Sequence, residues 1–73
     1  MKVKGFDNLF IEKGFDDEER IVFHGHQNIG KIYYSWLRLG GWGWSISTSA
    51  GQTYKSQREA ATTLWRKIKR DQK

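Results

Sequence analysis

Apolar and polar residues alternate through two segments in the middle of the chain, residues 31–38 and 42–48. Successive side chains of a β-strand point to opposite faces of a sheet, so a repeat of two residues indicates a strand with one apolar face. The pair Gly40-Gly41 lies between the segments and favours a tight hairpin, because both positions accept a positive φ. The sequence therefore predicts two hairpin-connected strands. Their apolar faces consist of Ile32, Tyr34 and Trp36 in the first and of Trp42, Trp44 and Ile46 in the second.

Shorter segments flank this hairpin. Residues 20–24 are rich in β-branched and aromatic residues and stop at Gly25, which predicts a strand, and residues 26–30 have the composition of a turn. After a further turn, residues 52–55 predict either a short fourth strand or an extended lead into a helix. The apolar run at 8–11 fits a helical turn or a strand, and its pattern does not separate the two.

The clearest signal for a helix begins at Ser56. Glu59 follows three residues later, the spacing of a capping box, in which each side chain satisfies a backbone N–H of the first turn. Apolar residues then recur at helical spacing, and Lys and Arg cover most of the remaining surface. We predict a helix over 56–70 that packs its apolar stripe on the sheet. The stripe consists of Ala60, Ala61, Leu64, Trp65 and Ile68.

These elements predict an α+β fold, in which one C-terminal amphipathic helix packs across an antiparallel sheet of three or four strands. A chain of 73 residues makes a single small domain over residues 1–73. We divide it into an acidic N-terminal segment (1–18), the sheet (19–55) and the helix (56–70).

Aromatic residues are numerous for so short a chain, eleven in all, of which four are Trp. Because each large ring buries roughly 150–250 Å², a few of them supply much of a small core. We expect Trp36, Trp44 and Trp65 to form that core, whereas the positions of Tyr33 and Trp42 stay open.

A tetrapeptide occurs twice near the N-terminus, since Lys4–Asp7 and Lys13–Asp16 both read Lys-Gly-Phe-Asp. Each Phe follows a Gly that permits a sharp turn. The spacing therefore suggests similar environments for Phe6 and Phe15.

The composition also bears on compartment and chemistry. The chain has no cysteine, no apolar run near the ~18 residues of a membrane span, and no signal-peptide pattern at its start. We therefore expect a cytoplasmic protein without disulfides or a membrane partner. His24 and His26 are two residues apart, but a metal site needs at least one more ligand. We expect no metal, no cofactor, no catalytic residue and no enzymatic activity.

Charge is distributed unevenly along the chain. Residues 1–24 hold four Lys or Arg against six Asp or Glu, a balance of −2, and residues 25–73 hold nine against two, a balance of +7. A basic body suggests a polyanionic partner or an acidic protein, and solubility alone is the alternative. Lys and Arg bind phosphates independently of base sequence. The candidate phosphate-binding residues are Lys31, Arg38, Lys55, Arg58, Arg66, Lys67, Lys69 and Arg70.

One small helix does not cover every aromatic ring of the predicted strands. Exposed rings of Tyr33 or Trp42, beside Lys31 and Arg38, would stack on bases as in proteins that bind single strands. The same rings would equally serve as energetic hot spots of a protein interface. The orientation of Tyr33 and Trp42 decides whether they belong to the core or to a binding surface.

Within residues 31–70, a Trp-x-Ile strand leads to a Gly turn and then to the pattern Tyr-x-Ser-x-x-Glu-Ala; the residues concerned are Trp44, Ile46, Gly51, Tyr54, Ser56, Glu59 and Ala60. With these residues the stretch resembles the small DNA-binding domains in which a three-stranded sheet packs on one helix: those of ethylene-response factors, methyl-CpG-binding proteins and integrase N-terminal arms.

In those families the sheet enters the major groove and polar strand residues read the bases. The resemblance places Lys31, Arg38, Ser45 and Ser47 at comparable positions, with fewer arginines than the families usually show.

Two hypotheses for function follow. The first is a small, non-catalytic accessory protein that binds nucleic acid, DNA rather than RNA, through a basic surface of sheet and helix. The alternative is a protein-interaction module or inhibitor, of the kind found in phages or plasmids. It would dock through exposed strand aromatics or through the acidic segment Asp16–Glu19.

Overall fold

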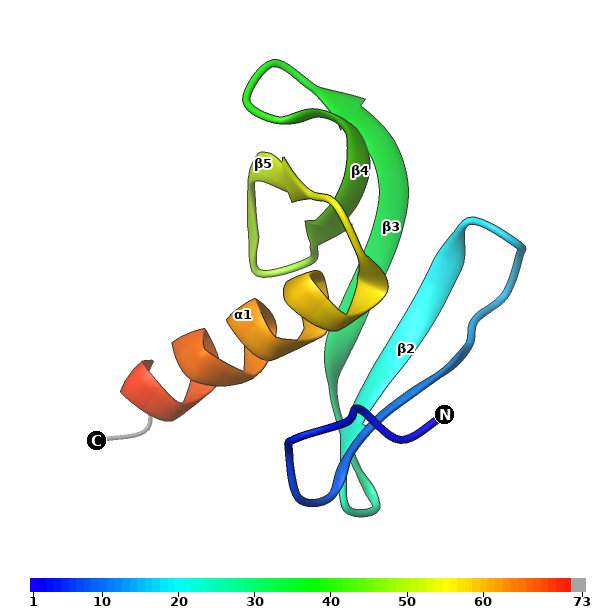
Figure 1. Cartoon of the computed structure of the whole chain (residues 1–73), viewed down its shortest axis with the longest axis vertical. Helices are drawn as coiled ribbons and strands as arrows, with labels where there is room; N and C mark the ends of the chain where they lie inside the picture. The colour runs from blue at the N-terminus through cyan, green and yellow to red at the C-terminus, as the bar shows by residue number, and fades with distance from the viewer. Residues whose placement is uncertain (72–73) are drawn as a thin grey trace.

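The computed structural model describes residues 1–71. Within these residues, five antiparallel strands form one sheet in chain order, β1-β2-β3-β4-β5, and a single helix follows them (Figure 1). The α+β class and the C-terminal helix are therefore confirmed, and the sheet has one strand more than the three or four predicted. The elements are β1 (Leu9–Lys13), β2 (Glu19–His24), β3 (Gln27–Leu37), β4 (Gly41–Ile46), β5 (Ser49–Tyr54) and α1 (Gln57–Asp71).

The additional strand is β1, the apolar run that the sequence pattern left ambiguous. It pairs with β2 in a regular register that places Ile11 opposite Val22. On its other edge Ile11 N–H donates to the Met1 carbonyl at 2.8 Å, and Val3 N–H donates to the Leu9 carbonyl at 2.7 Å. The sheet therefore begins at Leu9 and not at residue 19, and part of the predicted acidic segment belongs to it.

The turn predicted at 26–30 is also shorter than expected, because β3 already begins at Gln27. Gly25 has a φ of 65° and closes the hairpin within two residues. Gly30 lies inside β3 with a φ of 150°, and a Cβ there would come within 3.0 Å of Leu64. Gly30 thus lets the helix approach β3 closely, although the composition of residues 26–30 suggests a loop.

The Gly40-Gly41 hairpin is confirmed. Both glycines have positive φ, 99° and 70°, and a Cβ on Gly40 would come within 2.5 Å of the Thr53 hydroxyl. Only glycine fits that position without a shift of β5.

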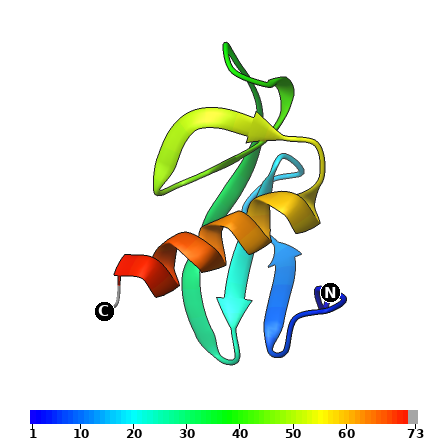
Figure 2. The same ribbon diagram turned by 60° about the vertical axis from the view of Figure 1, so that its left-hand side comes forward.

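The helix crosses one face of the sheet, as the view in Figure 2 makes clear. Ser56 caps it, since the Ser56 hydroxyl accepts a hydrogen bond from Glu59 N–H at 3.1 Å. The predicted stripe points inward: Ala60, Ala61 and Leu64 are fully buried, and Trp65 and Ile68 pack beside them. The buried core consists of Val3, Leu9, Ile11, Val22, Ile32, Ile46, Ala60, Ala61 and Leu64.

The core is aliphatic, so the prediction of a tryptophan core is wrong for Trp36, which is 56 % exposed. Trp44 and Trp65 are half-buried and pack against the aliphatic core. The repeated tetrapeptide does not place its two Phe alike either, because Phe6 packs on the core and Phe15 is 95 % exposed. Gly5 has a φ of 88°, which turns the first copy inward, whereas Gly14 has no positive φ.

Within residues 1–71, no helix combines the length and apolar character needed to cross a membrane.

Candidate functional site

The outer side of α1 is the first candidate surface. Arg58, Arg66, Lys69 and Arg70 are exposed and Lys67 is half-exposed. None of the five forms an ion pair within residues 1–71, where the acidic partners of ion pairs are Glu12, Asp17 and Glu19. Their charges are therefore available to an external anion.

Two of these cations border a hollow beside the first half of α1. Arg58 and Arg66 line it together with Glu59, Ser56, Phe6 and Thr62, and its volume is about 350 Å³. The guanidinium of Arg58 lies next to Gly5, where a Cβ would be 3.7 Å from Nη2. This hollow thus brings two exposed arginines and one carboxylate together beside the helix.

In the second half of α1, Trp65 anchors the surface. Its indole stacks on His24 of β2, with the ring centroids 4.0 Å apart, and the Lys69 ammonium lies 5.7 Å from the same indole. Lys69 therefore lies near the His24 end of the sheet. We call the surface formed on α1 by Arg58, Arg66, Lys67, Lys69 and Arg70 the basic helix face.

Lys31 and Tyr33 do not belong to that surface. They alternate with Ile32, which is buried under the helix, so they point to the opposite face of the sheet. The Lys31 ammonium pairs with Glu19 at 3.7 Å. On the same opposite face, Ser45 is only 6 % exposed, and its hydroxyl lies 3.2 Å from that of Ser35. Ser45 is therefore not accessible for reading bases.

A second surface lies where β3 and β4 extend beyond the helix. Cross-strand pairs share a face, so Tyr34 and Trp44, and next to them Trp36 and Trp42, continue the face that carries Ile32. Tyr34 stacks on Trp42 at 5.9 Å and meets Trp44 edge-on at 5.4 Å. We call the four rings of Tyr34, Trp36, Trp42 and Trp44 the aromatic surface.

Arg20 of β2 completes this arrangement. Its guanidinium lies 5.4 Å from the centroid of the Trp44 ring and donates to the carbonyls of Asp17 and Glu19, both at 2.8 Å. The arginine is therefore held in place by protein groups.

The turn between β1 and β2 lies beside the aromatic surface. Tyr34 N–H donates to the Glu18 carbonyl at 2.9 Å, which ties this turn to β3. Figures 1 and 2 both place the β1–β2 turn and the β3–β4 hairpin on the same side of the helix, away from the β2–β3 hairpin. We call the segment Asp16–Glu18 the acidic turn; Glu19 already belongs to β2, and its carboxylate pairs with Lys31 on the opposite face of the sheet.

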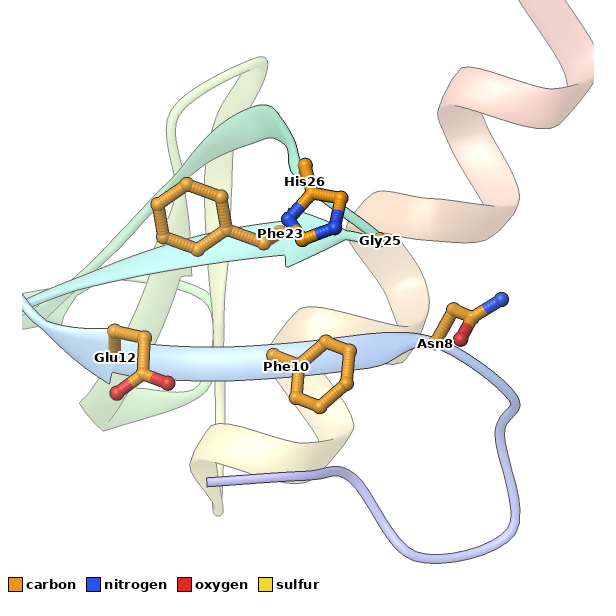
Figure 3. A pocket seen from close by; sticks show the side chains of 6 residues that line it. All are labelled: Asn8, Phe10, Glu12, Phe23, Gly25 and His26. Carbon is orange, nitrogen blue, oxygen red and sulfur yellow. The ribbon is translucent and has the colours of Figure 1, made fainter.

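A third feature is a shallow hollow on the sheet face away from the helix (Figure 3). Phe10 and Phe23 are cross-strand partners at its floor, and Asn8, Glu12 and His26 border an open volume of about 430 Å³. Because His24 stacks on Trp65 and His26 borders this hollow, the two histidines do not form a shared site. No group of His, Asp and Glu in residues 1–71 has the arrangement of a metal site.

The structure thus divides the predicted site. Arg58, Arg66, Lys67, Lys69 and Arg70 lie together on α1, and exposed Lys55 immediately precedes the helix cap. Lys31 and Tyr33 are on the far face of the sheet, and Arg38 and Trp42 are at the β3–β4 hairpin.

Sequence reasoning missed Tyr34, Trp36 and Arg20 as surface residues. Alternation correctly put Tyr34 and Trp36 on the core face. Whether they are exposed depends on how much of that face the helix covers. A signal was present in the number of aromatic residues, which exceeds what one helix of this length covers.

Comparisons of this chain with protein-family models, with curated proteins and with solved structures found no match.

Proposed function

We propose that this protein binds nucleic acid, DNA rather than RNA, through the basic helix face. The observation that supports the proposal is the set of five Lys and Arg on α1 that have no acidic partner within residues 1–71. Such a surface gains affinity by releasing the counterions condensed on a phosphate backbone.

The expected mode is contact with the backbone and not with base edges. Two of the four predicted reading positions on the strands, Lys31 and Ser45, do not favour base contacts, because Ser45 is buried and Lys31 pairs with Glu19. Arg and Lys on a helix contact phosphates whatever the base sequence. Such contacts fix the orientation of the protein on the DNA but carry no sequence information. Binding should therefore be weakly sequence-dependent and strongly salt-dependent.

The test is a titration of a short DNA duplex, at low and at physiological salt, with the protein and with the variant K67E/R70E. We expect binding with a steep salt slope, and we expect the charge reversals to weaken it by more than about tenfold and to reduce the slope by about two. Arg70 is exposed, Lys67 is half-exposed and neither belongs to the buried core, so the variant should keep the fold.

The matched control is K13E/R38E, which changes the net charge equally at two exposed residues away from α1. It should bind DNA with most of the affinity of the unaltered chain. Absence of binding at low salt, or equal loss in the two double variants, contradicts the basic helix face as the interface.

A further inference from the structure

The aromatic surface is larger than the fold requires. Tyr34, Trp36 and Trp42 are 41, 56 and 67 % exposed, although they continue the face whose other end forms the core. Exposed Trp and Tyr that lie together and stack on one another are the side chains that contribute most to protein interfaces.

The turn that lies beside these rings is acidic. Residues 13–20 contain Lys13 and Arg20 against Asp16, Asp17, Glu18 and Glu19, a balance of −2. Lys13 pairs with Asp17 at 3.2 Å, and Glu19 pairs with Lys31 at 3.7 Å, which leaves the carboxylates of Asp16 and Glu18 without an ion pair within residues 1–71. These two carboxylates would attract a cationic group.

The two features form one surface, because the hydrogen bond from Tyr34 to Glu18 fixes the acidic turn next to the rings. The exposed Phe15 lies in the same turn. In the sequence the acidic turn and the Trp36–Trp42 pair are separated by more than a strand. The fold brings carboxylates and ring faces together at one end of the sheet.

We propose that this end of the sheet docks a basic, arginine-bearing segment of a partner protein. Its guanidinium groups would lie on the faces of Trp36 and Trp42 and pair with the carboxylates of the acidic turn. The protein already contains this arrangement internally, in Arg20 over the Trp44 ring at 5.4 Å. The inference does not depend on nucleic-acid binding, which the opposite, basic end of the molecule would perform.

The test uses the full chain and a blocked peptide of alternating arginine and glycine, with the glutamate–glycine peptide as the probe of opposite charge. Indole N–H shifts in NMR report on each tryptophan. We expect the arginine peptide to shift the Trp36 and Trp42 signals and the glutamate peptide to leave them unchanged.

Two independent variants locate the binding. W36A/W42A should lower the affinity for the arginine peptide by about tenfold or more, as expected for paired hot-spot aromatics. D16N/D17N/E18Q leaves the rings intact. It should lower the affinity for the arginine peptide severalfold and make that affinity less dependent on salt. The matched control is Y33A, which removes a partly exposed ring from the opposite face and should change affinity by less than twofold.

Three results would overturn the proposal. One is equal weakening by Y33A and W36A/W42A. Another is binding of a single-stranded oligothymidylate that depends on Trp36 and Trp42, since the partner would then be unpaired bases. The third is concentration-dependent self-association in sedimentation that W36A/W42A abolishes, since a second copy's basic helix face would then be the occupant.

Discussion

The face shared by β3 and β4 is buried at one end and open at the other. At the covered end the pair Ile32 and Ile46 is fully buried under α1, and two pairs further along, Trp36 and Trp42 are more than half exposed. The strands, the register and the face are the same. The difference comes from the helix alone, whose fifteen residues cross the sheet and do not extend along it. Small aliphatic side chains therefore stabilise the fold, and the larger aromatic ones are left for contact with other molecules.

The largest effect should follow truncation at the covered end. Ile32→Ala removes a fully buried side chain beneath the helix, and the remaining cavity should lower the free energy of unfolding by about 2–5 kcal/mol. Urea denaturation followed by circular dichroism measures this. A loss similar to that of Trp36→Ala would contradict the division between the two ends.

The close approach of helix and sheet gives the next effect. Gly30→Ala places a Cβ within 3.0 Å of Leu64 at a φ of 150°, and should cost about 1–3 kcal/mol. Gly51→Ala is the control, because a Cβ there meets nothing within 4 Å and its φ is not positive. The two melting curves should separate clearly; coincident curves would mean that the helix does not lie so close to β3.

The hydrogen bond that caps the helix should have a smaller effect on stability than either change at the covered end. Ser56→Ala removes the acceptor of the Glu59 N–H and should cost about 1 kcal/mol. Ser56→Asp, which keeps an acceptor, should restore most of the stability in the same thermal unfolding assay. If Asp fails to restore it, the hydroxyl has another role.

The smallest effect is expected at the open end. Trp36→Ala should change the free energy of unfolding by less than about 1 kcal/mol, since it loses mainly the cross-strand contact with Trp42. The same denaturation experiment measures it. A loss of several kcal/mol would place Trp36 in the core, as first expected.

Local signals in the sequence predicted much of this fold. The Ser56–Glu59 spacing gave the start of the helix to within one residue, and alternation gave the correct face for every residue of β3 from Ile32 to Trp36. The hairpin at Gly40-Gly41 was predictable because both positions need a positive φ.

Contacts between distant residues were not predictable in this way. β1 is a strand because Leu9 and Ile11 pack under a helix some fifty residues later and because Met1 and Val3 bond to its edge. Likewise, its residue type predicted that Trp36 is in the core, but Trp36 is exposed because the helix does not cover it. The candidate site shows the same limit, since the acidic turn and the aromatic surface meet only through a tertiary hydrogen bond.

The order of the strands has a consequence for the rate of folding. Every strand of the sheet pairs with its immediate neighbours in the chain, so each hairpin forms from nearby residues before any distant contact is needed. Pairing between neighbours in the chain lowers the contact order and so favours faster folding, and the docking of α1 joins the most remote parts of the chain. The sequence contains no proline, so refolding should lack the slow phase that prolyl isomerisation causes. A single rapid exponential in stopped-flow refolding is the expected signature.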